Sequence, residues 1–389
     1  MKTIKIKFVD FNAPTFDAEN QWVTKVLRER YNVEFSEEPE FIFYSTWGLN
    51  FRNYPNAVKI FCGGEAVSPN FNECDFAFGF EPIYYNDRFC QYPLGDSDSP
   101  GLYDITRSIQ DRSAVSADLL ERKFCNFVYS QDWMGEGAIL RREFCKVLMG
   151  YKHVDCPSYV MNNMPRGTIS DRWTGLSCGN GTVSSGWSDG KLEFLRRYKF
   201  TIAFENTALS GYTTEKIIQP FQAFSIPIYW GNPDILSLFN PKAFINCNEY
   251  GNDFDSIIER VKELDNDNDK YLEMLSQPPM QESFDFDRRE KAKEFLYKII
   301  ERGPYPFAKD ALRISSSYRT FNEYNRVTEE LNTTKEAMKR MGYDSNSNTW
   351  KLVQKLQRFG DSKWGYIPKR IFHILIRIYK KLKIVKARY

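Results

Sequence analysis

The stretch YKFTIAFENTALSGYTTEKIIQPFQAFSIPIYWG, residues 198–231, places a polar, hydroxyl-rich turn between two apolar segments. Its pattern predicts a buried strand over Lys199–Phe204, a loop over Glu205–Thr213, a helix over Thr214–Phe224 and a strand over Ile226–Trp230. Such a β-loop-α-β unit is typical of doubly wound α/β domains. Ligands of these domains bind beyond the carboxyl ends of the parallel strands, so the loop is the expected ligand site.

The loop and the first turn of the helix supply groups that suit an anion. Thr214 is expected to cap the helix, and Glu215 and Lys216 fall in its first turn. Free backbone N–H groups at a helix N-terminus attract anions, and Lys216 adds a full positive charge. The pattern therefore favours a bound diphosphate. The other residues expected in the same crevice are Glu205, Asn206, Tyr212 and Thr213.

These residues, at these spacings, resemble the signature of the α-1,3/4-fucosyltransferases that use GDP-fucose, glycosyltransferase family 10. The family pattern reads YKF…FEN…YVTEKI…P…WG, and the visible departure is Thr213, where family members usually carry Val. The alternative is an ordinary βαβ core segment with a capped helix, because a lone TEK or FEN carries no functional information. The resemblance implies two Rossmann-like domains facing a cleft, the glycosyltransferase-B fold. Periodicity alone indicates only a two-domain α/β protein.

The chain of 389 residues is long for a single domain. The prediction is two Rossmann-like domains, an acceptor-binding one over residues 1–116 and a GDP-fucose-binding one over residues 117–302. A helical return segment over residues 303–341 follows them. A linker and a basic tail over residues 342–389 complete the chain. The elements expected in the first domain are strands over Lys5–Phe11, Glu40–Ser45, Val58–Gly63 and Phe76–Phe80 and a helix over Glu19–Glu29. Those expected to complete the second are strands over Lys123–Ser130 and Ala243–Asn246 and helices over Phe254–Leu264, Lys270–Leu275 and Arg288–Glu301.

A second stretch, KIFCGGEAVSPNFNECDFAFGF at residues 59–80 with NDR at 86–88, resembles the acceptor-side segment of the same family. Glu65 occupies the place of the proposed catalytic base. It follows a predicted strand and two glycines, so its carboxylate can reach an interdomain cleft with little obstruction. A base positioned at an attacking hydroxyl typically contributes about 10²–10⁴-fold to a rate. The alternative for Glu65 is a surface carboxylate after a tight turn.

Three cations match family positions that contact the donor. Arg141, in GAILRREFCKVL, falls at the pyrophosphate-contacting arginine, and a guanidinium can hold two phosphate oxygens at once. Lys191 matches a lysine that precedes the signature strand, with a plain helix-start lysine as the alternative. The resemblance also implies that Arg141 and Lys216 neutralise the departing GDP. It places Glu215 near the fucose or ribose, and Asn206, Tyr212, Thr213 and Thr214 in the nucleotide-sugar pocket.

No cofactor is expected, and a divalent metal at most stimulates. His153 and His373 are the only histidines, which disfavours a histidine metal site, and the run Asp265–Asp269 is expected to be a solvated turn. The eight cysteines show no CxxC pair, so reduced thiols are the simplest interpretation. The N-terminus, MKTIKIKFVDF, lacks the apolar core of a signal peptide. These features predict a cytoplasmic enzyme of bacterial type.

The net charge of +2 hides an asymmetry, because residues 350–389 carry twelve Lys or Arg and one acidic residue. The segment Ile367–Val385 places basic residues on one helical side and apolar ones opposite, which predicts a helix lying on an anionic inner membrane. Nucleic-acid binding and a docked core helix are the alternatives. A helix over Phe321–Met341 is expected to return onto the first domain or, alternatively, to form a weak homodimer.

The predicted function is therefore inverting transfer of L-fucose from GDP-β-L-fucose to a GlcNAc hydroxyl, by family default O3, of N-acetyllactosamine-type oligosaccharide acceptors. One alternative is a two-domain glycosyltransferase for another nucleotide sugar. Another is a membrane-bound nucleotide- or glycan-binding protein without turnover.

Overall fold

The structure, a computed structural model, describes residues 1–11, 16–92, 106–132, 135–169, 186–251, 253–307, 326–328 and 331–333. The chain divides into two compact units, Met1–Thr320 and Phe321–Tyr389. The first unit contains both sheets. In the second, residues 326–328 and 331–333 are helical, inside the helix predicted over 321–341. The predicted basic tail over 342–389 lies outside the described residues.

The first sheet is parallel and has six strands in the order β2-β1-β3-β4-β5-β6. Its strands are β1 (Thr3–Val9), β2 (Asn32–Phe35), β3 (Phe41–Tyr44), β4 (Val58–Cys62), β5 (Phe76–Phe78) and β6 (Phe89–Cys90). The sequences of β3 and β4, FIFY and VKIFC, are buried at every position because both faces of the sheet are covered. Helix α1 (Trp22–Arg28) packs on one of those faces through Val23, Val26 and Leu27.

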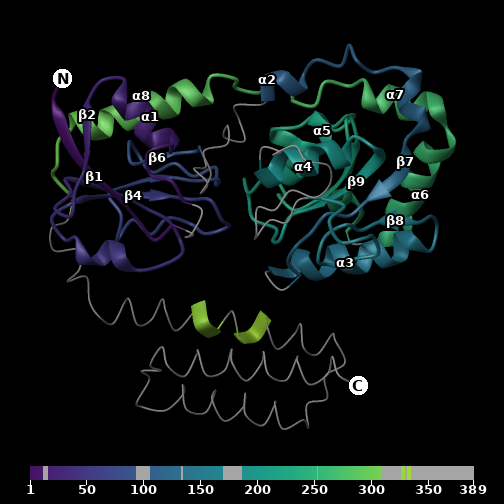
Figure 1. Ribbon diagram of the computed structural model, residues 1–389, viewed down its shortest axis with the longest axis horizontal. Helices are drawn as coiled ribbons and strands as arrows, with labels where there is room; N and C mark the ends of the chain where they lie inside the picture. The colour runs from purple at the N-terminus through teal and green to yellow at the C-terminus, as the bar shows by residue number, and fades with distance from the viewer. Residues whose placement is uncertain are drawn as a thin grey trace, which may run out of the picture. The chain divides into compact units, whose positions relative to one another are not determined.

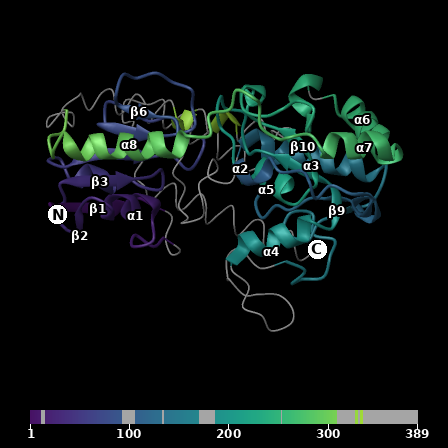
Figure 2. The same cartoon turned by 90° about the horizontal axis from the view of Figure 1, so that it is seen from above.

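Helix α8 (Arg288–Glu301) packs on this first sheet and not on the second, which corrects its predicted place at the end of the second domain. Phe295 packs edge-on against Phe78 of β5 at 5.1 Å, and the Tyr297 hydroxyl donates to the carbonyl of Val26 in α1 at 3.1 Å. Figures 1 and 2 show α8 lying along the strands of the first sheet. We call β1–β6, α1 and α8 the first lobe. The predicted domain 117–302 therefore ends with a helix that belongs to the core of the first lobe.

The second lobe is a five-stranded parallel sheet in the order β11-β10-β9-β7-β8, with its helices. Its strands are β7 (Lys123–Asn126), β8 (Val154–Asp155), β9 (Tyr198–Phe204), β10 (Ile226–Trp230) and β11 (Ile245–Asn246). Its helices are α2 (Thr106–Ile109), α3 (Gly135–Met149), α4 (Gly186–Leu195), α5 (Glu215–Gln222), α6 (Phe254–Asn266) and α7 (Asn268–Leu275). The core under α3, α6 and α7 lies on one face of β9 and β10, and α5 packs on the other. The two layers of helices confirm the doubly wound α/β expectation for residues 198–231.

Two arginines hold the C-terminal end of α5. The Arg112 guanidinium donates to the carbonyl of Phe221 at 2.9 Å, and Arg122 donates to the carbonyls of Ala223 and Phe224 at 2.9 and 2.6 Å. The last carbonyls of a helix lack the N–H group of a following turn, and positive charge is favourable at this end of the helix dipole. Phe224 has a φ of 52° and ends the helical path, so both arginines fix the point where the chain turns into β10.

No helix within the described ranges is long and apolar enough to cross a membrane. The cysteines of these ranges are free thiols, and six of the seven are buried. The eighth, Cys178, lies outside the described residues.

The placement of α8 predicts a specific stability loss. Leu296 is fully buried against the first lobe, and truncation of such a leucine to alanine typically costs about 2–5 kcal/mol. We expect Leu296→Ala to lower the free energy of unfolding by about that amount, measured by urea denaturation. Lys298→Ala, at an exposed position of the same helix, is the control and should change little. Equal effects of the two variants would contradict the docking of α8.

Candidate active site

The candidate site lies where the strand order of the second sheet reverses, between β7 and β9. The chain leaves β7 toward α3, which carries Arg141, and leaves β9 directly into Glu205 and Asn206. Ligands of doubly wound sheets bind beyond the carboxyl ends of the strands at this reversal. The predicted donor residues on α3, on the loop after β9 and on α5 therefore surround the position that the topology selects.

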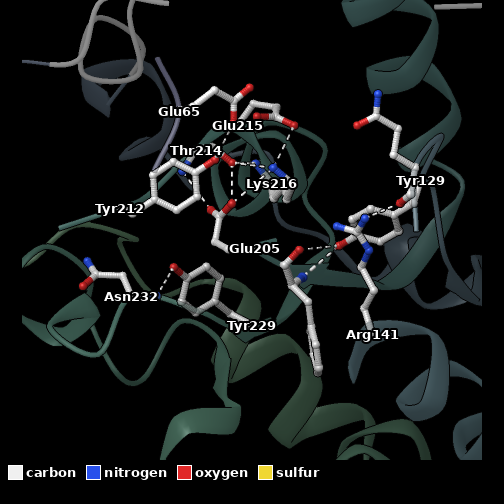
Figure 3. Close-up of polar contacts among 12 residues, drawn as sticks. Glu65, Tyr129, Arg141, Glu205, Tyr212, Thr214, Glu215, Lys216, Tyr229 and Asn232 are labelled. Atoms are coloured by element: carbon white, nitrogen blue, oxygen red, sulfur yellow. Dashed lines mark hydrogen bonds and ion pairs between the residues drawn. The ribbon is translucent and has the colours of Figure 1, made fainter. Parts of the chain in front are cut away.

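Glu205 is the centre of the polar contacts at this position (Figure 3). Its carboxylate is fully buried and accepts hydrogen bonds from the Thr214 N–H at 2.8 Å and the Thr214 hydroxyl at 2.7 Å. The ammonium of Lys216 lies 3.2 Å from the same carboxylate and 2.9 Å from the Thr214 hydroxyl oxygen. Thr214 is the N-cap of α5, as predicted. Glu205 thus fixes both the cap and the first cation of the helix.

The charges of this cluster depend on one another. Burial alone would lower the pKa of Lys216, but the negative charges of Glu205 and Glu215 outweigh it and raise that pKa. Burial raises the pKa of Glu205, and the positive charge of Lys216 opposes this change. Lys216 is therefore held as a cation in a largely buried place, where its attraction for a phosphate is less screened than in water.

Glycines make room for the Glu205 cluster. A β-carbon at Gly231 would lie 2.6 Å from Glu205 Cγ, and one at Gly137 would lie 2.1 Å from the Glu205 carbonyl oxygen. The N–H of Gly137 donates to the carbonyl of Asn206 at 2.9 Å, so the start of α3 rests on the end of β9. The glycine of the WG pair thus has a steric reason for its place in the sequence.

Lys191 and Glu215 join the cluster from outside. Lys191 lies within α4, where the sequence allowed a helix-start position, and its ammonium is 3.9 Å from the Glu215 carboxylate. Glu215 is half exposed and lies 3.6 Å from the Lys216 ammonium. The two lysines therefore share one carboxylate, and the predicted donor contacts Lys191, Glu215 and Lys216 are neighbours in space.

Arg141 lies to one side of the Glu205–Lys216 pair in Figure 3. Its guanidinium stacks 4.0 Å from the ring of Tyr129 and donates to the carbonyl of Gln131. The Tyr129 hydroxyl is itself fixed to the end of β9 by bonds to the Ile202 and Phe204 carbonyls at 2.9 and 3.1 Å. Arg141 is buried, and its Nε has no partner among the described residues. Burial lowers the pKa of Arg141. A buried positive charge with an N–H that has no acceptor favours an anionic partner.

Asn206 and Thr213 differ in whether their side chains already have a hydrogen-bond partner. The side-chain oxygen of Asn206 is buried and has no hydrogen-bond donor among the described residues, so it remains available to a ligand. Thr213 is fully buried, and its hydroxyl accepts a hydrogen bond from Asn232 at 3.0 Å. The Asn232 N–H donates to the Tyr229 hydroxyl at 3.0 Å. The Thr213 side chain therefore fixes the loop after β10, and this placement does not support its predicted contact with the donor.

The first lobe reaches this cluster through Glu65 and Phe80. The Tyr212 hydroxyl lies 3.4 Å from the Glu65 carboxylate and is its hydrogen-bond donor, and the Phe80 ring packs edge-on against Tyr212 at 4.8 Å. Gly211 has a φ of 79°, and a β-carbon there would lie 2.2 Å from the Phe80 carbonyl oxygen. The structure thus brings the predicted base next to the signature loop, although 147 residues separate Glu65 from Tyr212.

Among the residues that the structure describes, no group of three or more His, Cys, Asp or Glu side chains is placed to hold a metal ion. Asp265, at the start of the DNDND run, is not solvated as predicted. It is buried and pairs with Lys152 and with the Tyr151 hydroxyl, 2.9 Å away. Asp267 caps α7 through the N–H of Lys270.

Comparison with known proteins agrees with this geometry. The model of the α-(1,3)-fucosyltransferase FucT N-terminal domain matches residues 6–95, and the model of glycosyltransferase family 10 (fucosyltransferase), C-terminal part, matches residues 176–289. Together they cover more than half of the chain.

The chain belongs to glycosyltransferase family 10.

The relatives of this family 10 member include α-(1,3)-fucosyltransferase FucT of Helicobacter pylori. It is 32% identical over an alignment of 273 residues that covers 66% of this chain and 55% of the relative. A putative fucosyltransferase of Acanthamoeba polyphaga mimivirus is 31% identical over 40% of this chain and 24% of its own length. The matched part of the chain thus spans about half the length of the first relative and about a quarter of the second.

Solved structures show the same fold. A crystal structure of an α1,3-fucosyltransferase superposes with a TM-score of 0.58 at 26% identity, over 77% of this chain and 90% of that one. The crystal structure with GDP has a TM-score of 0.57 at 27% identity, and the structure with GDP-fucose has a TM-score of 0.55 at 25% identity. These matches confirm the glycosyltransferase-B architecture of this family 10 member.

Gly211 generates a prediction about the contact between the lobes. Gly211 and Gly251 both have positive φ, 79° and 54°, but a β-carbon at Gly251 would meet nothing within 4 Å. We expect Gly251→Ala to cost about 1 kcal/mol of stability, the price of the backbone conformation alone. Gly211→Ala should cost at least about 3 kcal/mol, because the Phe80 carbonyl must also move. Urea denaturation of both variants checks this, and similar losses would contradict the close approach.

Proposed function

We propose that the protein transfers L-fucose from GDP-β-L-fucose to O3 of GlcNAc in N-acetyllactosamine-type glycans, with inversion at the anomeric carbon. The observation that carries this proposal is the cluster of Glu205, Thr214 and Lys216 at the head of α5, with Arg141 beside it, at the reversal of strand order. Membership of family 10 and the likeness to a solved complex with GDP-fucose support it.

The diphosphate is the part of the donor that this cluster fits. The three N–H groups of the Lys216 ammonium have the Thr214 hydroxyl at 2.9 Å, Glu205 at 3.2 Å and Glu215 at 3.6 Å as neighbours. Glu215 is the longest and most exposed of these contacts, so a phosphate oxygen can replace it at the least cost. Arg141 supplies the second cation, with an Nε that has no partner within the described ranges.

The proposed reaction uses Glu65, whose carboxylate lies 3.4 Å from the Tyr212 hydroxyl. The Glu65 carboxylate takes the proton of the acceptor hydroxyl as its oxygen forms a bond to the anomeric carbon. The bond between that carbon and the β-phosphate oxygen breaks, and GDP leaves with the electron pair. One displacement converts the β-linked donor into an α-fucoside. Lys216, Arg141 and the N–H groups of α5 stabilise the charge that develops on the leaving group.

The proposal is tested by incubating the purified chain with GDP-fucose and N-acetyllactosamine and following GDP release and the fucosylated product. Thermal shifts with GDP-fucose, GDP-mannose and UDP-sugars separate it from a glycosyltransferase with another donor. Saturable GDP binding without product on a glycan array would instead indicate a binding protein without turnover. The array also decides between O3 and O4 of GlcNAc.

Two variants are expected to separate chemistry from donor binding. Glu65→Gln should lower kcat by about 10²–10⁴-fold and leave the Kd for GDP unchanged, because it removes only the base. Lys216→Ala should weaken GDP binding at least about tenfold, because it removes a charge-assisted contact. Glu282→Gln and Lys298→Ala, at exposed positions, are the matched controls. Normal turnover by Glu65→Gln would exclude Glu65 as the base.

We propose further that the tail binds an anionic membrane surface on the cytoplasmic side. The basic and apolar sides of Ile367–Val385 support this proposal, and each basic residue near such a surface contributes about 1 kcal/mol. Reversing Lys380 and Lys381 to Glu in the full chain is expected to weaken binding to anionic liposomes at least about tenfold. Turnover on soluble acceptors should not change. Binding to neutral liposomes is the control, and an unchanged affinity for anionic ones would overturn the proposal.

A further inference from the structure

The signature loop and the loop that carries Glu65 meet at a rigid contact. Tyr212 is 2% exposed, and its ring is held by Phe80 of the first lobe. The backbone before it is also fixed, because the N–H of Gly211 donates to the Asn232 side chain at 2.9 Å and that of Tyr212 donates to the Leu209 carbonyl at 3.0 Å. The Tyr212 hydroxyl therefore has a fixed position relative to both lobes.

The loop of Glu65 is tied down on its other side. The N–H of Gly63 donates to the Phe78 carbonyl at 2.8 Å, which joins the end of β4 to the end of β5. Three residues after Glu65, the Ser68 hydroxyl donates to the carboxylate of Glu81, which is buried just beyond β5. Backbone and side-chain bonds thus leave this loop little freedom, and its carboxylate faces Tyr212 in Figure 3.

The chemistry of a phenol limits what Tyr212 can do here. Its hydroxyl has one proton, and that proton is directed at Glu65. Burial raises the pKa of Tyr212 well above its usual range, against the positive charge of Lys216, so the hydroxyl keeps its proton at working pH. While it donates to Glu65 it cannot also donate to a phosphate. Its lone pairs can still accept a bond from a donor group.

We propose that Tyr212 is a positioning residue for Glu65, which orients the carboxylate and favours its ionised form. This inference rests on the proposed function, in which Glu65 is the base. It changes the role expected for Tyr212 from a contact of the nucleotide sugar to a support of the acceptor-side chemistry. The second lobe then supplies the tyrosine that supports the base, and the first lobe supplies the base itself. The pair forms only where the two lobes are in contact.

A hydrogen bond donated to a carboxylate stabilises its charged form, and a general base works only in that form. Removing the hydroxyl therefore shifts the acid limb of the kcat/KM profile toward higher pH. A bond to a charged group of this length corresponds to a shift of about half to one pH unit. Loss of the Tyr212 hydroxyl slows the chemical step and does not affect donor binding. We therefore expect kcat to fall and the Kd for GDP to stay unchanged.

The test compares wild type with Tyr212→Phe, which keeps the ring against Phe80 and removes only the hydroxyl. The kcat/KM profile is measured from acid to neutral pH, and GDP binding by calorimetry. We expect the acid limb to move up by about half to one unit, with GDP affinity within twofold of wild type. Tyr229→Phe is the matched control, because it removes another buried hydroxyl of this region that bonds Asn232 and not Glu65. Its acid limb should stay in place.

A double-mutant cycle gives an independent check. Glu65→Asp shortens the side chain and takes the carboxylate out of reach of Tyr212, so adding Tyr212→Phe to it should produce no further shift. An unmoved acid limb in Tyr212→Phe with GDP binding weakened tenfold or more would show that Tyr212 is a donor contact and would overturn the assignment. Additive shifts in the cycle would overturn it as well. Absence of fucosyl transfer by the wild type would instead overturn the proposed function, and this assignment with it.

Discussion

The buried carboxylate of Glu205 is the constraint on which the candidate site depends. A charge removed from water is costly unless it is paired, and here Thr214 and Lys216 supply both hydrogen bonds and an opposite charge. The same three residues define the start of α5, so the contacts that pair this charge also fix the first turn of the helix. Gly231 and Gly137 leave the space that the carboxylate and its backbone occupy. The head of α5 is therefore held by contacts within the protein itself.

Around this pair the cations are arranged on several elements. Lys216 comes from α5, Lys191 from α4 and Arg141 from α3, and Glu215 lies between the two lysines. The carboxylates paired with the two lysines, Glu205 and Glu215, also belong to the second lobe, whereas Glu65 comes from the first. A dianionic ligand at this position would find fixed charges and would not need to order long surface side chains, which lowers the entropic cost of binding.

Much of the fold was accessible from the sequence, for identifiable reasons. Strands β3, β4, β9 and β10 are mostly apolar runs, and their predicted limits differ from the observed ones by at most one residue. Strand β2 was not predicted because it is a short, mostly exposed edge strand, and β6 because it has two residues. The position of α8 could not be predicted, because an amphipathic pattern shows which face is buried and not which sheet covers it. Similarly, FEN and TTEK placed Glu205 in the crevice, but its central role arises only when β9, β10 and α5 are folded together. The Tyr212–Glu65 contact joins segments far apart in the chain and has no local pattern at all.

The two arginines at the far end of α5 have a consequence for how affinity can change. A helix of eight residues is about 12 Å long and is unstable in isolation, so it persists here because both of its ends are fastened. Arg112 and Arg122 fasten the end that lies away from the Thr214 cap. Substitutions around this end of α5 would let the helix tilt. The tilt would change the direction in which its first N–H groups point. If the head of α5 holds the donor as proposed, positions outside the family signature can change the affinity for that donor without any change in the residues at the helix cap.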